Sequence, residues 1–277
     1  SGVSPAADDV YSGNFGMQST VTLRNTLLGG SAATATPNLA RHNGGVITSE
    51  GNNLSSDSGA GVLTGPGDLV NTDPVLAPLT NYGGTTQTLA LLPGSPAINA
   101  GTATGAPTTD QRGIARVGAV DIGAFESRGF TLTPSSGSGQ SAFVNTGFAN
   151  PLVVSVAPVA AGEPVAGGVV RYAAPGSGAS ASLGSADAVI GAIGTASSTA
   201  SANGTPGGYT VSANANGSTG GVSFALTNLA APTVSVAPTT LSVNEAGETT
   251  DSFVVSLSAA PTSNVTIQLA FDANVQV

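Results

Sequence analysis

The stretch that decides the fold is Leu152-Val153-Val154-Ser155-Val156, in which large apolar side chains recur at every second residue. A period of two places such side chains on one face of a β-strand. The same alternation recurs in Gly168–Tyr172, Gly208–Ala213 and Val222–Asn228, with turn residues between the runs. No stretch keeps apolar residues at helical spacing for three turns without an interrupting glycine or proline. The sequence therefore predicts an all-β protein.

The charge of the chain narrows the choice of partners. The 277 residues are enough for two or three domains, and only 8% of them are charged, against roughly 25% in typical soluble domains. All six basic residues are arginines, and the 15 acids set the formal net charge at -9. Because nucleic acid and anionic membranes attract basic surfaces, we expect no nucleic-acid partner.

Cysteine and long apolar runs are both missing from the sequence. The absence of cysteine excludes disulfide scaffolds, thiolate metal sites and cysteine nucleophiles. No apolar run approaches the ~20 residues that a membrane-spanning helix needs. We therefore expect no membrane-spanning segment.

Residues 1–128 are rich in turns and contain short apolar runs. Two of these runs, Val21–Leu28 and Gly45–Thr48, predict brief strands, and the asparagines Asn25 and Asn53 stand 28 residues apart at comparable places. A period of this length is typical of one coil of a solenoid, in which neighbouring coils complete the core. The pattern favours stacked coils in this region.

Three later motifs in the same region point to a known family. They are Leu91–Gly101 (LLPGSPAINAG), Thr109–Arg116 (TDQRGIAR) and Asp121–Glu126 (DIGAFE). From about residue 21 to 126 the chain resembles the C-terminal portion of bacterial right-handed parallel β-helices, the module called the choice-of-anchor Q domain. The resemblance implies that residues 1–128 are the terminal coils and cap of such a helix.

Acids and arginines gather in the expected cap. Asp110, Arg112, Asp121 and Glu126 are the structural cap residues that we single out. Aspartates in turns accept hydrogen bonds from nearby backbone amides and pair with arginine, here Arg112 or Arg116. This interpretation gives the carboxylates a structural role rather than a catalytic one.

Residues 129–230 are expected to form one β-sandwich. Their alternating runs are separated by turn signals at the spacing of an immunoglobulin-like fold. The segments Pro164–Tyr172, Gly207–Val211 and Phe224–Asn228 resemble bacterial invasin-type immunoglobulin-like repeats. The resemblance implies an Ig-like domain in this part of the chain.

Residues 231–277 contain four further strand-like runs, which lie within 233–238, 241–245, 252–257 and 264–269. The segment is similar to the opening strands of Calx-β-like repeats. Four strands make about half of such a sandwich, so we expect an incomplete Calx-β-like or Ig-like unit. A half sheet of this size is marginally stable by itself.

No cofactor is expected, although structural calcium is a possibility that the acids leave open. The resemblance to Calx-β repeats implies calcium binding through loop acids, which makes Glu245, Glu248 and Asp251 the candidate metal ligands. Other hard oxygen ligands are available from Asp8, Asp9, Asp57, Asp68 and Asp73.

The sequence predicts no catalytic residue, and we expect that the chain is not an enzyme. Its single histidine, His42, is too little for a zinc hydrolase or a Ser-His-Asp triad. Glycoside hydrolysis needs two carboxylates beside a groove and usually aromatic platforms, whereas aromatic residues are 4% of the chain and tryptophan is absent. A polysaccharide-binding or polysaccharide-cleaving β-helix protein remains the alternative.

These features predict an extracellular or cell-surface protein with a structural or adhesive role. We expect a stalk or fibre-forming segment of a large bacterial surface or secreted protein, with copies of itself, or host or matrix glycans or proteins, as partners. Too few coils at the start and too few strands at the end would leave open sheet edges, which recruit strands from other chains. Head-to-tail assembly by strand complementation, leading to filaments, is a further expectation.

Overall fold

The computed structural model describes residues 10–12, 19–29, 37–41, 44–240, 251–258, 260 and 264–268. The described residues form strands, turns and one short 3-10 turn, Gly59–Gly61, and contain no α-helix, so the all-β prediction is confirmed. The chain divides into two compact units, residues 1–228 and 229–277. The expected boundary at residue 128 falls inside the first unit and stays a prediction.

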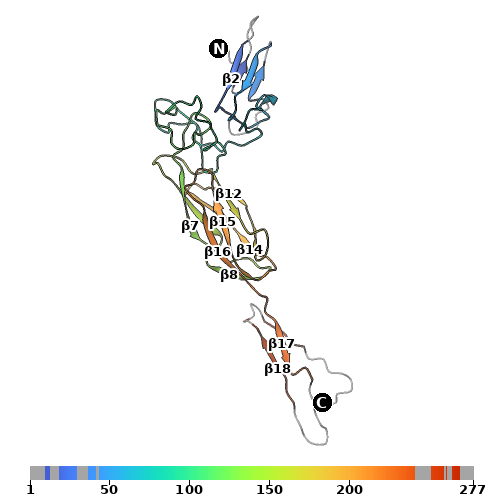
Figure 1. Cartoon of the computed structure of the whole chain (residues 1–277). Coiled ribbons are helices and arrows are strands. Elements are labelled where there is room, and N and C mark those ends of the chain that lie inside the picture. The colour runs from blue at the N-terminus through green and yellow to red at the C-terminus, as the bar shows by residue number, and fades with distance from the viewer. Residues whose placement is uncertain are drawn as a thin grey trace, which may run out of the picture. The chain divides into compact units, whose positions relative to one another are not determined.

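The strands are labelled in chain order (Figure 1). They are β1 (Val10–Ser12), β2 (Thr20–Leu23), β3 (Leu27–Leu28), β4 (Leu39–Arg41), β5 (Val46–Ser49), β6 (Leu54–Ser55), β7 (Phe130–Ser136), β8 (Gln140–Phe143), β9 (Leu152–Pro158), β10 (Val169–Ala173), β11 (Ala181–Leu183), β12 (Asp187–Val189), β13 (Thr195–Ser198), β14 (Ala200–Ala202), β15 (Gly207–Asn214), β16 (Val222–Leu229), β17 (Val234–Ala237) and β18 (Val254–Leu257).

The first six strands pair only in parallel. β1 pairs with β4, β2 with β5 and β3 with β6. Leu27 lies opposite Leu54, and an isolated parallel bridge then joins Leu54 to Leu69. Parallel neighbours cannot be joined by a tight hairpin, so each of these pairings needs a longer crossover connection. A small core of Leu23, Leu28, Leu39, Ile47 and Leu63 lies beneath these strands.

Two asparagines turn the backbone at equivalent points of successive crossovers. Asn25 has φ 50° and Asn52 has φ 54°, a left-handed conformation that asparagine tolerates better than most residues. Asn52 is thus the residue equivalent to Asn25, and the predicted equivalence of Asn53 with Asn25 was wrong by one residue. Asn53 is instead fully buried, and its Oδ1 accepts a hydrogen bond from the Thr26 amide at 2.9 Å.

Residues 130–229 supply two larger antiparallel sheets. A curled five-stranded sheet has the order β12-β10-β15-β16-β8, and a three-stranded sheet has the order β13-β9-β7. In β9 the side chains of Leu152, Val154 and Val156 are buried and the intervening ones are not. The alternation predicted from this stretch is therefore the alternation that builds the core.

Tyr172 of β10 joins the two sheets. Its hydroxyl lies 2.9 Å from the Ala196 carbonyl and 3.2 Å from the Leu152 carbonyl, both in the three-stranded sheet. Burial raises the pKa of Tyr172 to about 12. The ring packs against Phe224 of β16, with 6.1 Å between the ring centroids. A tyrosine with a satisfied hydroxyl thus lies in the middle of an apolar core.

The irregular segment before residue 128 and the sheets after it share this core. One cluster of buried apolar side chains includes Leu91, Ile122 and Phe125 together with Val170 and Phe224. Backbone hydrogen bonds cross the same junction, from Val169 to Pro93 at 2.8 Å and from Gly94 to Asn216 at 3.0 Å. The segment that contains residues 91–125 therefore packs directly against the sheets.

Among its described residues, the second unit contains one antiparallel ladder. Val234 of β17 lies opposite Leu257 of β18, and Val236 lies opposite Val255. Because side chains alternate across a strand, these four residues share one face of the ladder. Val234, Val236 and Leu257 are exposed on it. Two of the four strands predicted after residue 230 are thus present, residues 264–268 are described without strand pairing, and residues 241–245 lie outside the described residues.

Candidate functional site

The predicted cap residues form a single buried network next to the junction. Asp110, Asp121 and Glu126 are at most 6% exposed, although the whole chain has few charges with which to compensate them. The turn of residues 110–116 folds back on itself: an antiparallel bridge joins Thr109 to Ala115, and the Asp110 amide donates to the Ile114 carbonyl at 2.8 Å. This fold-back brings Asp110 and both arginines of the motif beside residues 121–126.

Asp110 and Arg112 form the first ion pair of the network. Oδ2 of Asp110 lies 2.8 Å from Nε and 2.8 Å from Nη2 of Arg112, so that one oxygen faces two guanidinium nitrogens. The same carboxylate accepts the amides of Arg112, Ile114 and Glu126. The Arg112 guanidinium also lies 3.5 Å from the centroid of the Phe125 ring, a cation–π contact. Both charges are therefore compensated inside the fold.

Arg116 and Glu126 form the second pair. Nη1 of Arg116 donates to Oε2 of Glu126 at 2.6 Å, and Nη2 donates to the Gly123 carbonyl at 3.0 Å. The carboxylate also accepts the amides of Val117 and Asp121. Nε of Arg116 is buried and, within the part of the chain that the structure describes, has no hydrogen-bond partner.

Asp121 has no direct arginine partner among the described ion pairs. Its Oδ1 accepts the Asn99 amide and its Oδ2 the Ser127 amide, each at 2.7 Å. Burial raises the pKa of Asp121 to about 7, and the charge of nearby Glu126 acts in the same direction against the two amide hydrogen bonds. Through its two oxygens, Asp121 connects its own turn to Asn99 and to Ser127.

Glu163 belongs to this network, and sequence reasoning missed it. Its carboxylate accepts the Arg128 amide at 3.1 Å and the Ser127 hydroxyl at 3.3 Å. Burial raises the pKa of Glu163. It comes from the loop between β9 and β10, so it ties Ser127 and Arg128 to the sheets. One feature of the sequence could have drawn attention to it, because Glu163 is the only acid between Glu126 and Asp187.

The predicted metal ligands are not brought together by the described residues. Glu245 and Glu248 lie outside these residues, as do His42, Asp8 and Asp9. The third candidate, Asp251, accepts the Ser252 amide at 2.9 Å. Within the described ranges no group of three or more His, Cys, Asp or Glu side chains is placed to hold a metal ion.

Asp57 and Asp68, two of the other candidate ligands, are engaged by the protein. Asp57 accepts the amides of Asn38 and Gly59 and the Ser55 hydroxyl. These hydrogen bonds outweigh the opposing effect of burial and leave the pKa of Asp57 lowered. Asp68 likewise accepts the Asn53 and Gly65 amides through different oxygens. Both carboxylates therefore hold turns.

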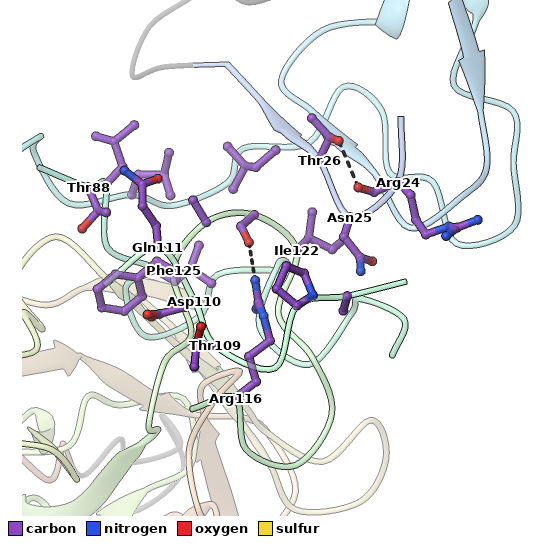
Figure 2. Close-up of a pocket in the computed structure, with 18 of the residues that line it drawn as sticks. Arg24, Asn25, Thr26, Thr88, Thr109, Asp110, Gln111, Arg116, Ile122 and Phe125 are labelled. Carbon is purple, nitrogen blue, oxygen red and sulfur yellow. Dashed lines mark hydrogen bonds between the residues drawn. The ribbon is translucent and has the colours of Figure 1, made fainter. Parts of the chain in front are cut away.

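A pocket of about 790 Å³ opens beside the network. Figure 2 shows Arg24 and Asn25 on one side of it, Thr88 and Gln111 on another, and Arg116 between them. Its wall also contains seven large apolar side chains: Leu27, Leu76, Leu79, Leu89, Leu91, Ile122 and Phe125. Such a volume lies within the range of ligand pockets, roughly 300–1,000 Å³.

The charges around this pocket are all paired. Arg24 pairs with Glu50, Arg116 with Glu126, and Asp110 with Arg112. A carboxylate already saturated by backbone amides and arginine is a poor proton shuttle, because its lone pairs are occupied. The arrangement can hold a fixed geometry and offer hydrogen bonds to a neutral ligand.

Comparisons with family models, with curated proteins and with solved structures give no match to this chain in any of the three. Among the described residues no helix is both long and apolar enough to cross a membrane.

Proposed function

We propose that this chain is an extracellular structural and adhesive segment, a stalk or fibre-forming part of a large bacterial surface or secreted protein. The observation that carries the proposal is the junction between the cap and the sheets. A stalk must transmit force across its module boundaries, and here the boundary has a common apolar core, backbone hydrogen bonds and the contacts of Glu163 with Ser127 and Arg128.

The finer architecture belongs to the same proposal. The three parallel ladders and the Leu27, Leu54 and Leu69 alignment support a right-handed β-helix end in residues 1–128. The two antiparallel sheets on one core support an Ig-like sandwich in residues 129–230. The β17–β18 ladder supports the start of a Calx-β-like or Ig-like unit in residues 231–277.

Assembly with further copies of the chain is supported by the apolar face of β17–β18. Val234 is 54% and Val236 43% exposed there. A two-stranded ladder is marginally stable alone and gains stability when its apolar face is covered or its edges are paired. We propose that another copy pairs with an edge of this ladder by strand complementation and also covers its apolar face. Matrix glycans or proteins are bound elsewhere on the assembly.

Detection of the native protein on intact bacteria tests the extracellular role. An antibody against residues 129–228 should stain unpermeabilised cells or the culture medium, and external protease should remove the cell-bound signal. A cytoplasmic enzyme serves as the control for lysis. Staining that needs permeabilisation, with the protein protected from external protease, would overturn the proposal.

A further inference from the structure

A second pocket lies between the irregular segment before residue 128 and the five-stranded sheet. Its volume of about 630 Å³ is within the range of ligand pockets, roughly 300–1,000 Å³. The irregular segment contributes Asp73, Val75, Gly94 and Pro96 to the wall, and β10, β12 and the segment 214–221 contribute the rest.

Three polar side chains stand in a row across the sheet at this pocket. Arg171 of β10 lies opposite Asp187 of β12 on one side and opposite Asn214 of β15 on the other. Directly opposite residues of antiparallel strands share a face, with Cβ atoms about 4.5–5.5 Å apart. This is the outer face, because Val170 and Tyr172 on either side of Arg171 are buried. The three side chains line the pocket and are exposed, so a ligand can reach them from solvent.

The hydrogen-bonding capacity of this row is not used within the described part of the chain. The Arg171 side chain has one interaction there, the ion pair with Asp187, and its 3.8 Å is too long for a hydrogen bond. The Asn214 side chain has no hydrogen-bond partner among the same residues. The buried Asp110 is instead saturated by backbone amides and arginine. The row therefore keeps donors and acceptors for a ligand.

Main-chain hydrogen bonds hold the two walls of the pocket together. The Val169 amide donates to the Pro93 carbonyl at 2.8 Å, and the Gly94 amide donates to the Asn216 carbonyl at 3.0 Å. Val169, Gly94 and Asn216 all line the pocket. Its shape is therefore fixed before a ligand arrives.

Val75 lies in this wall with a strained backbone. Its φ of 51° is in the left-handed region, which a β-branched residue rarely adopts. One oxygen of Asp73 accepts the Val75 amide at 2.9 Å, and the Val75 carbonyl accepts the Leu92 amide at 3.1 Å. The second oxygen of Asp73 has no partner among the described residues. Strained residues that their surroundings hold in place are typical of ligand-binding sites.

The composition of the wall restricts the chemistry of the ligand. A guanidinium donates hydrogen bonds, carboxylates accept them and amides do both, which matches sugar hydroxyls because each hydroxyl also donates and accepts. The charged residues of the wall are Asp73, Asp187 and Arg171, so its formal charge is -1 and an anionic ligand is disfavoured. Val75 and Val169 supply apolar surface for the C–H groups of a sugar ring.

We propose that this pocket binds a short neutral oligosaccharide, or the equivalent stretch of a neutral polysaccharide. Arg171 donates to its oxygens, Asp73 and Asp187 accept from its hydroxyls, and Asn214 does both. None of the described residues that line the pocket is aromatic, so recognition depends on hydrogen bonds and the affinity of one site is modest. The inference rests on the adhesive part of the proposed function, to which it assigns a site and a ligand class.

The test uses the full chain and a panel of neutral trisaccharides, namely maltotriose, cellotriose, mannotriose and triacetylchitotriose. We expect at least one of them to bind saturably in calorimetry at concentrations below about 10 mM. The same sugar should shift the backbone amide NMR signals of Arg171, Asn214 and Gly220, which line the pocket. Trigalacturonate should bind at least tenfold more weakly, because its carboxylates would meet Asp73 and Asp187.

Three variants separate binding from folding. Arg171→Ala and Asn214→Ala each remove hydrogen-bonding groups of the row and should weaken the sugar at least fivefold. Thr210→Ala is the matched control, because Thr210 is exposed on the same strand and face as Asn214 but lies outside the pocket wall, so binding should be unchanged. All three side chains are exposed, so the thermal midpoints should stay at that of the parent.

Three results would overturn the inference. One is the absence of binding by every neutral trisaccharide to a folded chain, and another is trigalacturonate that binds as tightly as the neutral sugars. The third is binding that survives both Arg171→Ala and Asn214→Ala, because the sugar would then lie elsewhere. Failure of the proposed function is distinguishable, since it is a protein that antibody detects only after permeabilisation, whatever sugar it binds.

Discussion

Arg116 and Glu126 form a buried ion pair, with Nη1 and Oε2 2.6 Å apart and side chains that are 10% and 1% exposed. Removing one member of such a pair leaves the other charge uncompensated in the interior. We therefore expect Glu126→Gln to lower the free energy of unfolding by ~3–5 kcal/mol, measured by urea denaturation.

The matched control is the exposed pair of Arg171 and Asp187, which are 3.8 Å apart with side chains 76% and 57% exposed. Water screens such pairs, so Asp187→Asn should change stability by less than about 1 kcal/mol. If Glu126→Gln lowered the free energy of unfolding no more than Asp187→Asn does, the buried pair would not support the fold.

Asp121 should make stability depend on pH. Its pKa is raised from 3.8 to about 7, so the folded protein binds this proton more tightly than the unfolded chain. The resulting stabilisation is complete below pH 3.8 and is lost as the pH rises through 7. A single such group contributes a slope of up to about 1.4 kcal/mol per pH unit.

Urea denaturation at several pH values between 4 and 7 checks this prediction. The free energy of unfolding of Asp121→Asn should fall less with rising pH than that of the parent, whatever its absolute value. Glu163, whose pKa is also raised, acts in the same direction in both proteins and cancels in the difference. Parallel curves for parent and variant would contradict the assignment.

The hydroxyl of Tyr172 should stabilise the contact between the two sheets. Tyr172→Phe removes the donor to the Ala196 carbonyl and leaves buried groups unpaired, which we expect to cost about 1–2 kcal/mol in guanidinium denaturation. Tyr209→Phe is the control, because the Tyr209 hydroxyl is buried and lacks a partner among the described residues. That substitution should be neutral or slightly stabilising, and a larger loss there than at Tyr172 would refute the argument.

The left-handed backbone of Asn52 predicts an order among substitutions. Asn52→Ala loses the hydrogen bond from Nδ2 to the Ala100 carbonyl and also strains a residue with φ 54°. Asn52→Gly loses only the hydrogen bond. The Asn52→Ala variant should therefore be less stable than the Asn52→Gly variant by about 1 kcal/mol in thermal unfolding. If the glycine variant were the less stable of the two, a left-handed backbone at residue 52 would be contradicted.

The exposed face of β17–β18 should govern self-association. Val236→Ser reduces its apolar area, so we expect weaker association by sedimentation velocity over a range of concentrations. Val254→Ser is the control, since Val254 pairs with Ala237 on the opposite face of the ladder and is itself exposed. Loss of association with Val254→Ser alone would place the contact on the other face.

The strands were predictable where one face of a strand is buried, because burial imposes a strict alternation on the sequence. Leu152 to Val156 in β9 and Val222 to Asn228 in β16 are examples. The cap motif was predictable in composition, since Asp110 and Arg112 are only two residues apart and meet locally. Glu163 was not, because its partners Ser127 and Arg128 lie 35 or more residues away.

By itself, the sequence determined an all-β chain in which the few charged residues concentrate in turns. Period-two alternation and frequent glycine and proline leave no other regular structure. Tertiary structure alone decided which asparagine turns each crossover, that Asp121 is buried between Asn99 and Ser127, and that Leu89 and Leu91 line a pocket with Arg116. Such contacts join residues far apart in the chain, and their free energy depends on burial, which no local pattern encodes.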